Sequence, residues 1–81
     1  MNLVPKTEGL RLTKIKSGTC ARVQFINAGK NAREKLISMG LVPGKEVEVI
    51  SSSGHGPVVV KVDDTRIALG HGLADKVIMK L

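Results

Sequence analysis

Aromatic side chains are almost absent from this sequence of 81 residues, which has one phenylalanine, Phe25, and neither tryptophan nor tyrosine. A hydrophobic core must therefore be built from valine, leucine and isoleucine, and the β-branched members of this set favour strands. Apolar alternation along residues 19–26 places Ala21, Val23 and Phe25 on one inward face. The sequence thus predicts no exposed aromatic platform on which nucleic-acid bases could stack.

Cysteine is also scarce. The single Cys20 excludes an internal disulfide and favours a cytosolic setting, and its expected place within a strand does not favour a catalytic thiol. His55 and His71, each between two glycines, could with Cys20, Asp63 or Asp64 supply metal-ligand atoms, but their spacing matches no known metal site. We therefore expect no catalytic residues, no cofactor and no specific metal site, and leave adventitious metal binding by His55, His71 or Cys20 open.

Long apolar runs are missing as well. The longest stretch without a charged side chain, residues 49–60, contains serines and glycines. A membrane-spanning helix needs roughly 20 apolar residues, and the first residues lack the apolar region of a secretory signal. We expect one soluble domain over residues 1–81, with a loosely ordered segment at 1–9 and no membrane insertion of its own.

Acidic residues are outnumbered, since 13 Lys and Arg stand against seven Asp and Glu, for a formal charge of +6. This balance favours an anionic partner such as nucleic acid, a lipid headgroup surface or an acidic protein face. No two basic residues are adjacent, so an ordinary solvated surface is equally consistent with the charge. Nucleic-acid binding through phosphate contacts stays an alternative, with these candidate residues: Arg11, Arg22, Arg33 and Arg66.

The spacing of the apolar residues that are present predicts a mainly β fold. Ala32, Leu36 and Met39 form one stripe of a helix of about ten residues that begins at Lys30. Residues 63–64 are a link short enough for a hairpin. Strands are expected near residues 10–12, 19–26, 45–50, 57–62, 65–69 and 77–81, and a helical turn within 70–76. We predict a small SH3-like barrel of about five strands, with a short helix after the second strand and a helical turn before the last.

The segment GLVPG, residues 40–44, joins this helix to the next strand. Gly40 lies where a helix commonly ends in a left-handed residue, and residues 42–45 fit a type II turn with proline second and glycine third. The turn either presents Leu41 and Val42 as an exposed apolar tip or uses Leu41 to cover the end of the barrel. The first interpretation predicts that Leu41→Asp leaves the fold intact.

These features resemble the FeoA family, the small cytosolic component of bacterial ferrous iron uptake. The resemblance is carried by LTKIKSGTCARV, KNAREKLISMGLVPGKEVEVI, PVVVKVDDTRIAL and the closing ADKVIMKL, which together extend over about residues 10–81. Its most specific part is the helix that runs into MGLVPGKEVEV.

The resemblance implies an SH3-like barrel without enzymatic activity of its own. It implies a regulatory or accessory role at the inner face of the membrane, by contact with the cytoplasmic region of FeoB, a ferrous iron transporter with a GTPase domain. Self-association through an exposed strand edge stays open. The expected contact residues are the helix residues Arg33 and Ile37 and the junction residues Met39, Gly40, Leu41, Val42, Pro43 and Gly44.

Overall fold

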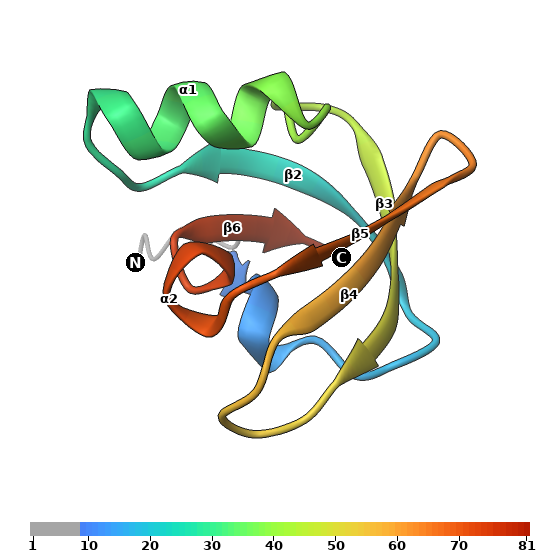
Figure 1. Ribbon diagram of the computed structural model, residues 1–81. Helices are drawn as coiled ribbons and strands as arrows, with labels where there is room; N and C mark the ends of the chain where they lie inside the picture. Colours follow the sequence, from blue (N-terminus) through green and yellow to red (C-terminus); the bar gives the residue numbers. More distant parts are fainter. Residues whose placement is uncertain (1–8) are drawn as a thin grey trace, which may run out of the picture.

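The structure is a computed structural model that describes residues 9–81, which form a six-stranded antiparallel sheet and two short helices (Figure 1). The elements in chain order are β1 (Leu10–Arg11), a 3-10 helix η1 (Leu12–Lys14), β2 (Cys20–Ile26), α1 (Lys30–Ser38), β3 (Glu46–Ser52), β4 (Val58–Val62), β5 (Thr65–Leu69), α2 (His71–Ala74) and β6 (Val77–Lys80). The mainly β prediction is confirmed, including the helix after the second strand and the helical turn before the last. All six strand segments expected from the sequence are present, and the first of them, β1, is only two residues long and pairs with β6.

The expected loose segment at residues 1–9 lies outside the described residues except for Gly9. Gly9 packs closely, because a Cβ added there would come within 2.5 Å of the carbonyl oxygen of Met79. This close approach favours glycine at the point where the described chain enters the sheet.

The sheet has the strand order β1-β6-β2-β3-β4-β5 and curves around one core. Strand β2 produces much of this curvature, because Cys20–Arg22 pair with β3 whereas Arg22–Ile26 pair with β6. The core is aliphatic apart from one methionine, and no polar side chain of residues 9–81 is buried with it. Its members are Leu12, Ile15, Ala21, Val23, Ile26, Leu36, Leu41, Val47, Val49, Val58, Val60, Val62, Leu69, Ala74, Val77 and Met79.

Phe25 does not belong to this core, so its predicted inward orientation is wrong. The pairing of β2 with β6 shifts register between Val23 and Phe25, which leaves Gln24 as an extra residue of a β-bulge. Beyond the bulge the alternation is inverted: Ile26 is buried and Phe25 is 47% exposed. The one aromatic ring of the protein therefore lies on its surface.

Helix α1 ends as the sequence predicts. Gly40 has a φ of +93°, its N–H donates to Ile37 at 2.9 Å, and the N–H of Leu41 donates to Leu36 at 3.1 Å. These two backbone bonds are those of a Schellman motif, in which the residue after the glycine turns back toward the last helical turn. Leu36 and Leu41 are both fully buried as a result.

The turn after Gly40 is also the predicted one, since Lys45 N–H donates to Val42 at 3.0 Å and Gly44 has a φ of +91°. The turn is fastened to β2, because Gly44 donates to the carbonyl of Val23 at 2.7 Å and Val23 donates to that of Lys45 at 3.0 Å. This fastening directs Leu41 inward. The exposed-tip interpretation is therefore wrong for Leu41, which covers the core, while Val42 is half-buried.

The β4–β5 hairpin follows its predicted pattern. Asp63 and Asp64 both have positive φ, 51° and 69°, as a two-residue type I′ turn requires. On β4 the three valines at alternate positions face the core. In the part of the chain that the structure describes, no helix has the length and apolar character needed to cross a membrane.

The buried position of Leu41 predicts a large loss of stability in Leu41→Ala. Removing a buried leucine side chain leaves a cavity and costs about 2–5 kcal/mol in free energy of unfolding. Chemical denaturation followed by circular dichroism measures this loss. Leu10→Ala is the matched control, since Leu10 is 44% exposed and its loss should cost well under half as much. Equal effects of the two changes would contradict the placement of Leu41.

The left-handed backbone at Gly40 predicts that Gly40→Ala is destabilising by about 1–2 kcal/mol, because a Cβ is strained at positive φ. The new Cβ would also lie 3.3 Å from Cγ1 of Val62. Gly29, at the start of the same helix, has a φ of −72° and open space around it, so Gly29→Ala should change stability little. Thermal unfolding of both variants tests this, and equal midpoints would contradict it.

Candidate partner-binding surface

A shallow groove of about 260 Å³ lies between α1 and β2, the pair of elements seen one above the other in Figure 1. Two of the large apolar side chains that remain exposed on the protein, Phe25 and Ile37, contribute to it, with Ile37 41% exposed. The full lining is Phe25, Ile26, Arg33, Ile37 and Pro43. Apolar side chains gathered at one hollow are typical of a binding surface, whereas isolated ones are not.

Each side chain of the groove is placed by a local feature of the backbone. The bulge at Gln24 turns Phe25 outward from β2. In α1, Leu36 takes the core position, and its neighbour Ile37 lies 100° further around the helix, toward the surface. Pro43 is exposed because it forms the corner of the type II turn. The groove is therefore built on backbone that hydrogen bonds already fix.

The groove carries positive charge. Arg33 is an exposed part of its lining, and none of the ion pairs found within residues 9–81 involves it. Helix α1 also presents Lys30 and Lys35, against one acidic residue, Glu34. An apolar surface with an exposed guanidinium beside it suits a protein partner with apolar anchors and nearby carboxylates.

The structure brings together only part of the predicted contact set. Arg33, Ile37 and Pro43 line the groove, and Gly44 is exposed in the turn beside it, whereas the remaining predicted residues are half-buried or, for Leu41, fully buried: Met39, Gly40, Leu41 and Val42. Sequence reasoning missed Phe25 and Ile26. Their adjacency in the sequence could have indicated that one of them is exposed, because neighbouring side chains of a regular strand point to opposite faces of the sheet.

Four different elements carry the arginines proposed for phosphate contact: Arg11, Arg22, Arg33 and Arg66. Arg22 donates to the carbonyl of Gly44 at 3.0 Å, and Arg11 pairs with Asp75. Phe25, although exposed, is a single ring without a second aromatic to extend a stacking platform.

The potential metal ligands lie in two places. Cys20 is exposed and lines a shallow hollow together with Asp63 and Asp64, among charged side chains of both signs, and neither histidine belongs to this lining. The rings of His55 and His71 have centroids 6.3 Å apart, so the fold brings the two GHG segments together. Between residues 9 and 81 no group of three or more His, Cys, Asp or Glu side chains could hold a metal ion.

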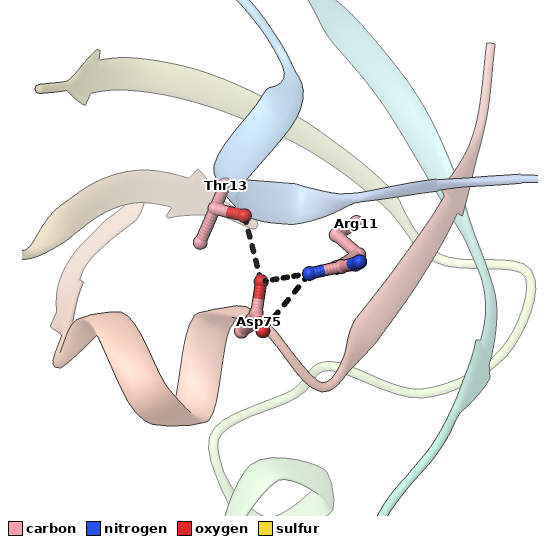
Figure 2. A network of polar contacts seen from close by, with 3 residues as sticks. All are labelled: Arg11, Thr13 and Asp75. Atoms are coloured by element: carbon pink, nitrogen blue, oxygen red, sulfur yellow. Dashed lines mark hydrogen bonds and ion pairs between the residues drawn. The ribbon is translucent and has the colours of Figure 1, made fainter. Parts of the chain in front are cut away.

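One polar network joins the beginning of the described chain to its end (Figure 2). The guanidinium of Arg11 donates from Nη1 to both carboxylate oxygens of Asp75 at 3.3 Å, and the hydroxyl of Thr13 donates to Oδ1 at 3.0 Å. These bonds tie β1 and η1 to the end of α2. The hydrogen bond from Thr13, with the bond and charge of Arg11, holds the pKa of Asp75 below its ordinary value although desolvation opposes this shift.

Comparison with known proteins identifies the family. The FeoA domain family matches residues 10–81, nearly the whole chain. The chain belongs to the FeoA family. A candidate Fe(2+) transport protein A from Methanocaldococcus jannaschii is 37% identical over 65 residues, which cover 80% of this chain and 78% of that protein.

Solved FeoA structures share the fold. The crystal structure of an iron uptake regulatory protein, FeoA, superposes with a TM-score of 0.83 at 39% identity, and covers 88% of this chain and 95% of that one. FeoA from Stenotrophomonas maltophilia, crystallised with zinc, has a TM-score of 0.75 at 28% identity, with coverage of 85% and 87%. It is described as a prokaryotic SH3 domain protein and a candidate activating factor of ferrous iron transport. The SH3-like prediction is thereby confirmed.

Membership of the FeoA family assigns the domain an accessory role in ferrous iron transport, and the family is not a known enzyme family. The side chains that line the groove include no nucleophile or general base. The Arg11–Thr13–Asp75 network is a structural feature of this FeoA domain, and none of its three residues lines the groove.

The lowered pKa of Asp75 predicts a pH-dependent contribution to stability. A carboxyl whose pKa is lower in the folded than in the unfolded state stabilises the fold fully above its unfolded pKa, and loses this contribution as the pH falls through the folded value. The stability difference between the native protein and Asp75→Asn should therefore be constant near neutral pH and shrink below about pH 4. Urea denaturation across this range measures it. A difference that persists unchanged in acid would contradict the charge-based explanation.

Proposed function

We propose that this domain acts by binding the cytoplasmic GTPase domain of a FeoB-type ferrous iron transporter through the groove of Phe25, Ile26, Arg33, Ile37 and Pro43. The domain would then work at the inner face of the membrane without entering it. The observation that carries this proposal is the exposure of Phe25 and Ile37 on one groove. Membership of the FeoA family supplies the transport setting.

The groove contains the kinds of side chain that form a small binding hot spot. Complete burial of one large apolar side chain contributes about 1.5–3 kcal/mol, so Phe25 and Ile37 together could supply much of the affinity of a modest interface. Arg33 beside them would orient an acidic partner surface and raise the association rate. Since fixed backbone supports Phe25 and Pro43, little conformational entropy is lost on binding.

The GLVPG segment has a different part in this proposal. Gly40 and Gly44 supply the backbone conformations that set Pro43 beside the groove, and Leu41 anchors the turn in the core. Only Pro43 of these residues lines the groove itself. We therefore expect substitutions at Gly40 or Leu41 to weaken binding indirectly, through loss of folded protein, whereas substitutions at Ile37 act on the contact directly.

An NMR titration of the isotope-labelled protein with the GTPase domain of the cognate transporter tests the proposal. Amide shifts should cluster on residues 25–26 and 33–37 and on Gly44, since Pro43 has no amide N–H. Ile37→Gln should weaken binding by about tenfold or more, because it replaces a buried apolar contact with an amide that must be desolvated. Leu10→Gln is the matched control, since Leu10 is exposed to a similar degree on β1, away from the groove.

Two results would refute this assignment. Shifts that avoid the groove, or equal affinities of the two glutamine variants, would place the partner surface elsewhere. An absence of any shift at high partner excess would reject FeoB contact itself. A second comparison isolates charge: Arg33→Glu should reduce the association rate more than Lys14→Glu, although both change the net charge equally.

A further inference from the structure

Strand β5 is one of the two outermost strands of the sheet, and none of residues 9–81 pairs with its outer edge. It pairs with β4 through five consecutive residue pairs without a register shift. No other described element pairs with it, and the hairpin that carries it projects from the body of the domain in Figure 1. Edge strands are usually protected by proline, bulges or several charges, and β5 has only one of these, Arg66.

The register decides which backbone groups the open edge presents. In a two-residue hairpin the pair next to the turn, here Val62 and Thr65, is hydrogen-bonded, and hydrogen-bonded pairs then alternate along the ladder. Thr65, Ile67 and Leu69 therefore direct their N–H and C=O groups toward β4. Arg66 and Ala68 direct theirs away from it, and no backbone bond within residues 9–81 engages these groups.

We infer that a second copy of this chain pairs with this edge, β5 against β5, as an antiparallel twofold dimer centred on Ile67. In this arrangement Arg66 of one copy lies opposite Ala68 of the other. Each of these two symmetric pairs exchanges both of its backbone hydrogen bonds. All the outward-facing groups of β5 are satisfied at once, which is the requirement of a self-complementary interface.

Neighbouring registers are less favourable. Centring the pairing on Arg66 would place two guanidinium groups directly opposite each other, which is destabilising. Centring it on Ala68 would need the carbonyl of Gly70, which already accepts a bond from Ala74 at 3.0 Å. The register centred on Ile67 avoids both problems. It also brings together the two half-buried Ile67 side chains on the core-facing side of the sheet.

This surface is separate from the groove. Strands β3 and β4 lie between β5 and β2 in the sheet, so a dimer would leave both grooves free. The β5–β5 dimer and the binding of a partner at the groove should also respond to salt in opposite ways. Each copy carries a formal charge of +6, so screening should strengthen the dimer, whereas it should weaken a contact guided by Arg33.

Sedimentation equilibrium of the full chain from micromolar to millimolar concentration, at low and high salt, tests this inference. The expected result is a monomer–dimer equilibrium that high salt shifts toward dimer. Ala68→Pro removes the N–H that faces the partner and leaves the bonds to β4 intact, and proline is tolerated at such edge positions. Because the dimer is symmetric, Ala68→Pro removes one of the two backbone hydrogen bonds from each Arg66–Ala68 pair. We therefore expect dimerisation to be at least about tenfold weaker. Ala68→Ser, which keeps the N–H, is the matched control and should dimerise normally.

A measurement on the unaltered chain keeps the test independent of how the proline variant folds. In a mixed sample of ¹³C-labelled and unlabelled protein, an isotope-filtered experiment should show a contact between the two Ile67 Hα atoms, which face each other in a non-hydrogen-bonded pair. A monomer at all concentrations would overturn the inference. So would a dimer that shows no such contact, or one that the proline variant forms as readily as the serine variant.

Discussion

The left-handed backbone at Gly40 is the constraint on which the arrangement of this domain depends. It ends α1, reverses the chain within one residue and sends Leu41 back under the last helical turn, where it closes the core beside Leu36. A short helix of this kind is unstable alone, so its attachment to the sheet through Leu36 and Leu41 is what keeps it folded. The turn that follows then continues the ladder between β2 and β3 through the bonds of Gly44 and Lys45 to Val23.

A second local irregularity, the bulge at Gln24, determines which side chains of β2 reach the surface. It buries Ile26 and exposes Phe25 at the groove beside α1. Exposure of an aromatic ring is unfavourable for an isolated domain, and it is explained if a partner covers the ring. The transporter contact that we propose uses this ring together with Pro43 of the junction between α1 and β3.

The domain holds its charges at the surface, where they act on association more than on stability. The core contains no charged side chain among the described residues, and the ion pairs of Arg11 with Asp75 and Lys45 with Asp63 lie at the surface. Surface pairs of this type each contribute little to stability. Basic residues outnumber acidic ones by six, and this excess positive charge can attract an anionic partner surface.

The sequence by itself determined the elements whose cause is local. Alternating valines defined β3 and β4, the short link at Asp63 and Asp64 defined a hairpin, and glycine and proline spacing defined both the end of α1 and the turn at Pro43. Only the tertiary structure decided the orientation of Phe25 and Leu41. A bulge arises from the fit of two strands far apart in the sequence, and the burial of Leu41 depends on bonds between its turn and β2. Local periodicity contains neither piece of information, so the groove and the open edge of β5 became visible only once the strands were paired.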